Sequence, residues 1–360
     1  MATLLSSPAH IGAPSRPAAT ASLGSLTGLR WVAAVVVFAY HLRNLQYFDG
    51  PAQTMLSVLF GAGSTAVSLF FILSGFVLAY SYRSTGLGRY YLRRVARVYP
   101  LHLVGVALAV CVGATVFPDI RTIDTRALVA NLLLANSWFS PWWQAGNPVS
   151  WSLACEVFFY LCAPLLIRFI AARGITAIRV ILALSLAATW VAPMIAVAGP
   201  GISPYSFPPV RLAEFIAGIA AACLVRDHGW RPRGLVLPLS ATLVGYVAAS
   251  LLGDTPFGAA SATGIGFVLL IVKLATDDLD GRGSWLSSPL LQMLGAASFA
   301  FYLVHLLVLQ CVLSLLPPER TDAGALVAAV LAFIAASALA VLLHKGVEGP
   351  AHALLTRARR

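Results

Sequence analysis

Residues 324–345, GALVAAVLAFIAASALAVLLHK, contain twenty successive uncharged positions before the first ionisable side chain. A helix of about 20 apolar residues is long enough to cross the roughly 30 Å hydrocarbon core of a bilayer. Similar stretches recur along the chain, which is 59% hydrophobic and 10% charged and has a mean hydropathy of +0.85. Soluble domains carry roughly 25% charged residues. The sequence therefore predicts an all-α polytopic protein of the cell membrane.

Hydropathy predicts ten transmembrane spans, which leave no room for a soluble catalytic domain. Their approximate ranges are 31–47, 65–82, 99–118, 151–170, 177–198, 210–226, 235–252, 258–275, 292–316 and 324–345. A further apolar stretch, 128–139, is too short to cross the bilayer, and we expect it to be re-entrant or interfacial. The membrane domain is expected to cover residues 26–352, between a disordered tail at 1–25 and a basic tail at 353–360.

The distribution of charge predicts the orientation of the chain. Of the 24 Lys and Arg residues, ten crossings leave only Arg43, Arg121, Arg126, Arg211 and Arg320 on the side opposite the two termini. Cytoplasmic loops of membrane proteins collect Lys and Arg, so we expect both termini in the cytoplasm. The same rule accounts for the net charge of +11, and nucleic-acid binding is not expected. The five cysteines lack metal-ligand spacing, and we expect no metal site.

Arg30 and His41 are two polar residues of the first predicted span. Eleven helical positions separate them, which gives a rise of about 16 Å and close to three full turns. We therefore expect both side chains to face one cavity, with Arg30 at the cytoplasmic mouth and His41 near the middle of the membrane. The alternative is a snorkelling Arg that anchors the helix end and a hydrogen-bonded packing His.

Glu156 lies about two turns inside the fourth predicted span, in SWSLACEVFF. A carboxylate at that depth must be paired, protonated or in contact with water, which favours a functional site. The alternative is a structural ion pair, for which Arg211 is the candidate partner. Trp151 opens the same span, and Tyr302 and His305 lie in the ninth; we expect these three to contact a substrate, although each could instead be a packing residue.

Arginines cluster after the second predicted span, in RYYLRRVARVYP at 89–100. Arg93 and Arg97 are four residues apart and would share one face of a helix. Guanidinium groups suit phosphate, so this pair could hold a phosphorylated ligand at the cytoplasmic surface. Anchoring to anionic lipid is an equally good explanation.

These segments, in this order, resemble the acyltransferase 3 family of integral membrane proteins, which transfer acyl groups to hydroxyls of sugars and related acceptors. The similarity runs from about residue 26 to 352. It is carried by Arg30 and His41 in the family's Arg-x10-His spacing, SLFFILSGFVLAY (68–80), RRVARVYP (93–100), SWSLACEVFFYLCAPL (150–165), RLAEFIAGI (211–219), ASFAFYLVH (297–305) and VEGP (347–350).

The resemblance implies a ten-span fold with cytoplasmic acyl-CoA as donor and no permanently bound cofactor. Arg30 and His41 match the family's residues most tied to activity, Glu156 matches an acid in its Ser-x-Glu segment, and His305 closes a segment in which Phe301 replaces the common Leu. The implied acceptor is a hydroxyl of a carbohydrate, a glycoside or an antibiotic-type molecule.

Acyl transfer to a hydroxyl needs a general base, and His41 is our candidate. Arg30, Arg93 and Arg97 are the candidate phosphate ligands, and Glu156 and His305 would orient His41 or bind the acceptor. We expect direct transfer rather than an acyl-enzyme on Ser74 or Cys155. The alternative function is a multi-span transporter or flippase of a glycosylated or lipid substrate, since buried Arg, Glu and His also suit a transport pathway.

Overall fold

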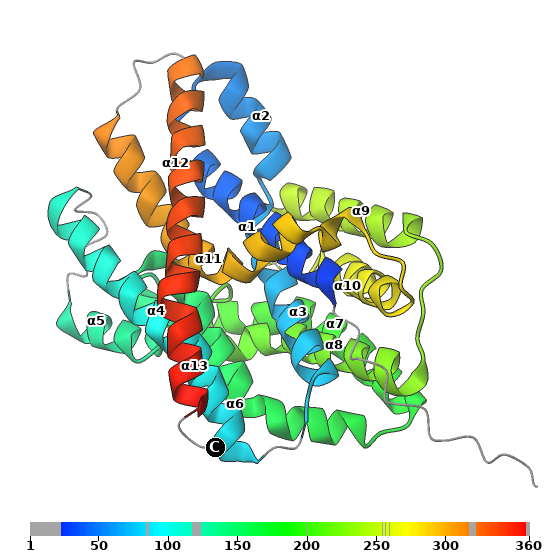
Figure 1. The fold of residues 1–360 in the computed structure, drawn as a ribbon. Coiled ribbons are helices and arrows are strands. Elements are labelled where there is room, and N and C mark those ends of the chain that lie inside the picture. The colour runs from blue at the N-terminus through cyan, green and yellow to red at the C-terminus, as the bar shows by residue number, and fades with distance from the viewer. Residues whose placement is uncertain are drawn as a thin grey trace, which may run out of the picture.

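The computed structural model describes residues 23–83, 86–116, 124–199, 201–253, 255, 257–258, 260–316 and 322–357, and all regular structure in these ranges is helical (Figure 1). The helices are α1 (Gly24–Asn44), α2 (Gly50–Phe60), α3 (Ala66–Tyr80), α4 (Leu87–Thr115), α5 (Thr125–Leu132), α6 (Trp151–Ala171), α7 (Ile175–Ala198), α8 (Pro208–His228), α9 (Val236–Leu252), α10 (Gly264–Leu279), α11 (Pro289–Leu315), α12 (Asp322–Leu343) and α13 (Gly349–Arg357). In hydrocarbon a helix pairs its backbone groups internally, which is why long apolar sequences take this form.

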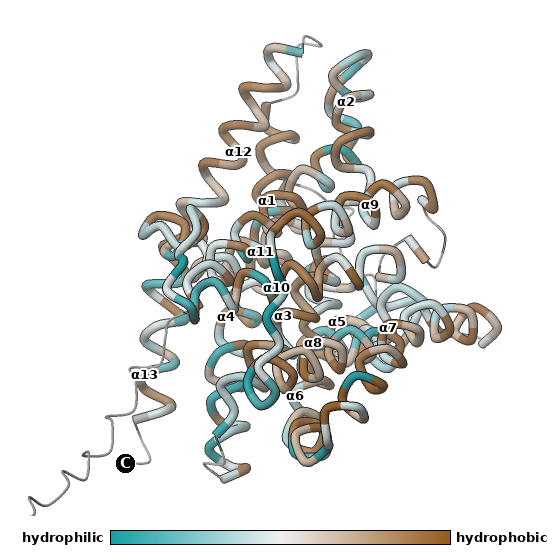
Figure 2. Tube along the Cα trace, turned by 90° about the vertical axis from the view of Figure 1, so that its right-hand side faces the viewer, coloured by the Kyte–Doolittle hydropathy of each residue, from teal (hydrophilic) through white to brown (hydrophobic). Residues whose placement is uncertain are grey.

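Each of the ten predicted spans coincides with a helix. Eight helices in the described part of the chain are long and apolar enough to cross a membrane, and one of these combines α2 and α3. The remaining two, α9 and α10, have 17 and 16 residues. The prediction of an all-α polytopic membrane protein is confirmed, and Figure 2 shows α12 and α9 as largely hydrophobic along their length.

The short apolar stretch at 128–139 does not form a span. Its first part belongs to α5, which has eight residues, and 3-10 turns follow at Asn136–Trp138, Ser140–Trp142 and Pro148–Ser150. The side chains of two asparagines fix this irregular segment: Asn136 donates to Trp143 O (2.8 Å) and Asn147 donates to Leu303 O in α11 (2.8 Å).

Helices extend into both predicted tails where the structure describes them. The helix α1 begins at Gly24, inside the predicted tail 1–25, and residues 1–22 lie outside the described residues. Asp278 of α10 stabilises this start, because its carboxylate accepts hydrogen bonds from Ser25 N (2.8 Å) and Ser25 Oγ (2.6 Å). At the other end, α12 continues through a π-helical turn, His344–Glu348, into α13, so residues 353–357 of the predicted basic tail are helical.

Glycines permit the closest helix crossings. A Cβ at Gly75 of α3 would overlap Phe215 O of α8, and a Cβ at Gly218 of α8 would overlap Ile72 O of α3. Small residues that let backbones approach closely are the usual means of packing helices in membranes. In the same way, a Cβ at Gly295 of α11 would overlap Thr27 O of α1, so this glycine lets α11 and α1 approach closely. These two crossings hold α1, α3, α8 and α11 together around the cavities described next.

Candidate active site

Three adjoining cavities run between α1, α3, α6 and α11. Arg30 and Glu156 line both the first and the second cavity. Val67 and Tyr302 line both the second and the third. Their volumes are about 180, 40 and 630 Å³ respectively. We call them the arginine cavity, the middle cavity and the histidine cavity.

The arginine cavity concentrates charge inside the helix bundle. Arg30 of α1, Arg94 and Arg97 of α4, and Glu156 and Tyr160 of α6 contribute to its lining. Glu156 accepts a hydrogen bond from the hydroxyl of Tyr160 (3.0 Å). The Arg94 guanidinium lies over the ring of Tyr160, 5.7 Å from its centroid. Its Nε is buried without a hydrogen-bond partner among the described residues, so this cavity holds a donor available to a ligand.

Arg93, which the sequence suggested as the partner of Arg97, is exposed and does not line this cavity. Arg94, three residues before Arg97, takes that place. Both spacings put two residues on one helical face, so spacing alone does not choose between them. The face of α4 that carries Arg94 and Arg97 also carries the buried residues Tyr90, Val98 and Leu101. This periodicity of apolar residues was the sequence signal that could have identified Arg94.

The middle cavity is narrow and mostly aromatic. Phe70 and Phe71 of α3 and Phe299 and Tyr302 of α11 surround it, together with Ser152 of α6. The Tyr302 hydroxyl donates to Val149 O (3.1 Å) and accepts from Ser152 Oγ (3.0 Å), which fixes the ring between the middle and histidine cavities.

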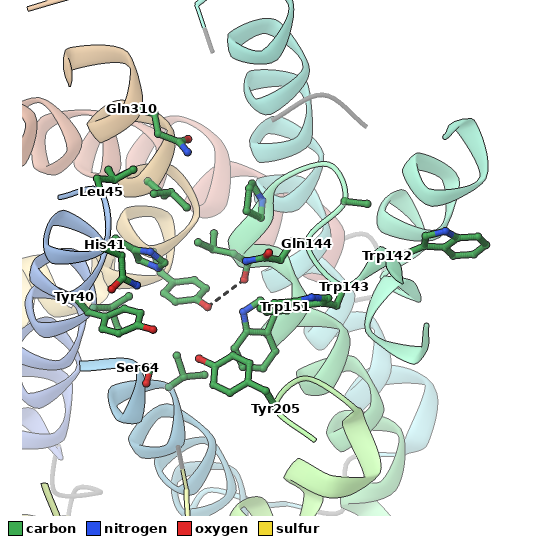
Figure 3. A pocket seen from close by; sticks show the side chains of 18 of the residues that line it. Tyr40, His41, Leu45, Ser64, Trp142, Trp143, Gln144, Trp151, Tyr205 and Gln310 are labelled. Atoms are coloured by element: carbon green, nitrogen blue, oxygen red, sulfur yellow. Dashed lines mark hydrogen bonds between the residues drawn. The ribbon is translucent and has the colours of Figure 1, made fainter. Parts of the chain in front are cut away.

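The histidine cavity is the largest of the three and is rich in aromatic side chains (Figure 3). Tyr40, His41 and Ser64 lie on one side, at the end of α1 and the start of α3, facing Trp151 and Tyr205. The other aromatic and amide side chains of the lining are Trp142, Trp143, Gln144, Asn44, Tyr302 and Gln310. Aromatic faces with a few amide and hydroxyl groups suit an amphipathic ring-shaped ligand.

Tyr205 and Trp143 were not found from the sequence, because both come from irregular segments that carry no helical period. Their rings pack on Trp151, with centroids 4.7 and 6.1 Å from it. Burial raises the pKa of the Tyr205 phenol above its usual value, so this group stays a neutral hydrogen-bond donor. An unusual density of Trp and Tyr at 138–151 and 205 was the available signal.

His305 of α11 lies beside His41, with ring centroids 5.2 Å apart. Its Nδ1 lies 2.8 Å from Tyr302 O, and since a carbonyl only accepts, this nitrogen carries the proton. The other nitrogen, Nε2, therefore holds a lone pair, and it is buried without a partner among the described residues. His305 lines none of the three cavities, so it does not contact a ligand there as the sequence suggested; instead it offers an acceptor close to the His41 ring.

Arg30 and His41 do not line the same cavity, which corrects the expectation from their spacing. Since α1 begins earlier than predicted, Arg30 lies six residues inside the helix and His41 only three residues from its end. Arg30 faces the arginine and middle cavities, whereas His41 faces the histidine cavity. The two residues stand at opposite ends of the three adjoining cavities.

Arg211 is not the partner of Glu156. It forms a buried ion pair with Glu214 of the same helix (2.6 Å) and donates to Tyr205 O (2.7 Å). Its guanidinium also lies 5.6 Å from the ring centroid of Trp151. Arg211 therefore supports the aromatic wall of the histidine cavity, and Glu156 remains free to face the arginine cavity.

The sequence matches the acyltransferase 3 family, described as an acyltransferase domain, over residues 23–345. The chain belongs to this family. It is therefore a multi-pass membrane acyltransferase. It is 37% identical to acyltransferase MdmB of Streptomyces mycarofaciens, over 95% of each chain.

More distant relatives of the acyltransferase match over part of their length. Peptidoglycan O-acetyltransferase OatA of Listeria monocytogenes is 29% identical over 39% of this chain and 23% of its own length. O-acetyltransferase OatA of Staphylococcus aureus is 26% identical over 42% of this chain and 26% of its own length. No solved structure matches the acyltransferase.

Proposed function

We propose that this protein transfers an acetyl or other short acyl group from cytoplasmic acyl-CoA to a hydroxyl of a carbohydrate, glycoside or antibiotic-type acceptor. The observation that carries the proposal is the row of three adjoining cavities, with arginines at one end and a histidine at the other. The names of the Listeria and Staphylococcus relatives, which are O-acetyltransferases, support a hydroxyl acceptor.

The arginine cavity is the proposed donor site. Acyl-CoA is polyanionic, and Arg30, Arg94 and Arg97 supply fork-shaped donors suited to its phosphates. Positive-inside counting puts this end of the protein at the cytoplasm, where acyl-CoA is found. The extended pantetheine arm is comparable in length with the separation of about 16 Å between Arg30 and His41 along α1. The thioester would then reach His41 through the middle cavity.

The histidine cavity is the proposed acceptor site. Its volume of about 630 Å³ lies within the range of small-molecule sites, roughly 300–1,000 Å³. Trp143, Trp151 and Tyr205 offer flat faces on which a sugar or another ring can stack. The acceptor hydroxyl would lie next to His41, while Gln144 and Gln310 are available to its other polar groups.

His41 is the proposed general base. It takes the proton of the acceptor hydroxyl while the hydroxyl oxygen bonds to the thioester carbonyl carbon. The tetrahedral intermediate then loses the C–S bond, and the departing thiolate of coenzyme A takes the proton back from His41. His305 Nε2, which is buried and unpartnered, would accept a hydrogen bond from His41 N–H and hold the ring with its other nitrogen toward the acceptor.

The surroundings of Cys155 and Ser74, the two candidate nucleophiles, favour direct transfer over an acyl-enzyme. Cys155 is fully buried, interacts through its Sγ with Ser206 O (3.3 Å) and lines none of the three cavities. Ser74 lines the arginine cavity and not the histidine cavity that holds His41. A thioester has a good leaving group, so a covalent intermediate is not needed.

The experiment is to incubate the purified protein in proteoliposomes with acyl-CoA labelled in the acyl group and a panel of glycosylated acceptors, then to identify the products by mass spectrometry. We expect a labelled ester on at least one acceptor, and no acid-stable label on the protein when acceptor is omitted. Flux of unmodified acceptor without acyl-CoA would favour a transporter or flippase instead.

A further inference from the structure

A fourth cavity, of about 540 Å³, lies between α7 and the end of α8. It shares no lining residue with the three cavities of the candidate active site. The distribution of Lys and Arg between the loops places this region, where α7 begins and α8 ends, at the cytoplasmic face.

The turn after α8 builds the charged end of this cavity. The helix ends at His228, and Gly229 adopts the left-handed conformation with φ 66°. Trp230 N then donates to Leu224 O (2.9 Å), which closes the helix end and turns the chain back. As a result Trp230 and Arg231 return to the cavity wall beside His228.

The cavity has one basic end and one apolar end. Arg179, His228 and Arg231 supply the polar groups, and the lining includes no acidic side chain. Both arginines are exposed; Arg231 is partly neutralised by Asp280, 3.7 Å away, whereas Arg179 forms no ion pair within the described ranges. Leu182 and Leu186 follow Arg179 along α7 and extend the lining by about 10 Å into the membrane.

The apolar end is continuous with the lipid-facing surface of α7. Val180 and Leu184 on this helix are 50% and 63% exposed. A ligand here would place an anionic group among the basic side chains at the interface and an acyl chain along Leu182 and Leu186. Basic recesses between helices at the cytoplasmic side are a known form of lipid headgroup site, and Trp230 is of the residue type that anchors at this level.

We propose that this cavity binds one anionic phospholipid, with its phosphate on Arg179 and Arg231 and an acyl chain against α7. The charge complementarity selects an anionic over a zwitterionic lipid, and the apolar extension selects a lipid over a free phosphate. The site is separate from the candidate active site, since it shares no lining residue with the three cavities.

The test counts lipids retained by the intact full-length protein, using mass spectrometry after release from nanodiscs that contain phosphatidylglycerol or phosphatidylcholine with the same acyl chains. The wild type should retain phosphatidylglycerol preferentially. Arg179→Gln should lower its apparent affinity about fivefold, the effect of one basic charge near a membrane surface. The matched control is Arg233→Gln, which removes an exposed arginine two residues from Arg231 and outside the cavity lining, and it should leave retention unchanged.

Four results would overturn the proposal. Equal retention of the two lipids, or equal losses in Arg179→Gln and Arg233→Gln, would mean general attraction to a charged surface. Displacement of the lipid by soluble glycerol phosphate would mean a phosphate site without a lipid chain. Displacement by acyl-CoA at concentrations that saturate transfer would assign the cavity to the donor.

Discussion

Two neighbouring arginines of α4 have different surroundings. Arg94 lines the arginine cavity with a buried unpartnered Nε, and Arg93 is exposed. Arg94→Gln should raise the apparent KM for acyl-CoA by roughly 10- to 100-fold, because hydrogen bonds to charged groups contribute about 1.5–3 kcal/mol. Arg93→Gln, which removes the same charge from the same helix, should change KM little. Steady-state kinetics on both variants check this, and similar losses would show that the surface charge alone matters.

His305 is predicted to act through His41. In His305→Ala, kcat should fall by about tenfold or more while the KM for acyl-CoA and the thermal midpoint of unfolding stay near wild type. His305→Gln keeps an acceptor atom and should lose less. Cys311→Ala on the same helix is the control, because Cys311 lies about 9 Å further along α11 than His305, which is the residue beside His41. A loss of thermal stability that accounts for all lost activity would leave His305 with only a packing role.

The residues predicted from the sequence are those that polarity makes conspicuous inside an apolar helix. Arg30, His41 and Glu156 all line the adjoining cavities, since a polar side chain in a span must face a cavity or a partner. Their arrangement was harder to predict. The start of α1 is held by Asp278 of α10, a partner 253 residues away along the chain that the sequence around Ser25 does not reveal.

At the scale of helices, the crossing of α3 and α8 positions residues around the histidine and middle cavities. Nearer the start of α3, Ser68 accepts a hydrogen bond from Arg211 of α8 (2.9 Å). The ring centroid of Phe71 lies 5.0 Å from the same guanidinium. Gly75→Val would force the two backbones apart, since even a Cβ at Gly75 overlaps Phe215 O. We expect it to lower the free energy of unfolding by about 1–3 kcal/mol, measured as a fall in the thermal midpoint in detergent.

A glycine without close neighbours provides the control for this crossing. Gly88 in the first turn of α4 has open space around the position of a Cβ. Gly88→Ala should leave stability unchanged or slightly raised, because Ala favours helix more than Gly does. If Gly75→Val is as stable as Gly88→Ala, the close approach of α3 and α8 does not contribute to stability.

The positions of the long helices were readable from hydropathy, whereas the segments between them were not. The ranges 151–170 and 177–198 differ from α6 and α7 by only a few residues. The segment from Leu133 to Ser150 has no period, because its 3-10 turns are fixed by single side chains such as Asn136 and Asn147. This segment carries Trp142 and Trp143, and so the aromatic wall became visible only in the folded protein.

At the scale of the whole molecule, the arginine and histidine cavities lie toward opposite ends of α1. The distribution of Lys and Arg places the start of α1 at the cytoplasmic side. We therefore expect acyl-CoA to enter from the cytoplasm and the acceptor from the other side. Sealed inside-out vesicles test this, because acyl-CoA added outside then faces the cytoplasmic surface. A membrane-impermeant acceptor trapped in the lumen should become acylated.

The control for sidedness places the same acceptor outside the vesicles, together with acyl-CoA. We expect little product there until the vesicles are opened with detergent. If product forms only when donor and acceptor are on the same side, the histidine cavity is filled from the cytoplasm and the predicted orientation of transfer is wrong.

The central claim is that the acyl group of acyl-CoA is transferred to the acceptor with His41 as the base. The most direct test compares single-turnover transfer of labelled acyl groups by wild-type protein and by His41→Ala in proteoliposomes, with acyl-CoA binding measured on the same samples. We predict that His41→Ala binds acyl-CoA like the wild type but transfers the label about 10²- to 10⁴-fold more slowly, the usual contribution of a general base. Near wild-type transfer by His41→Ala would contradict the account.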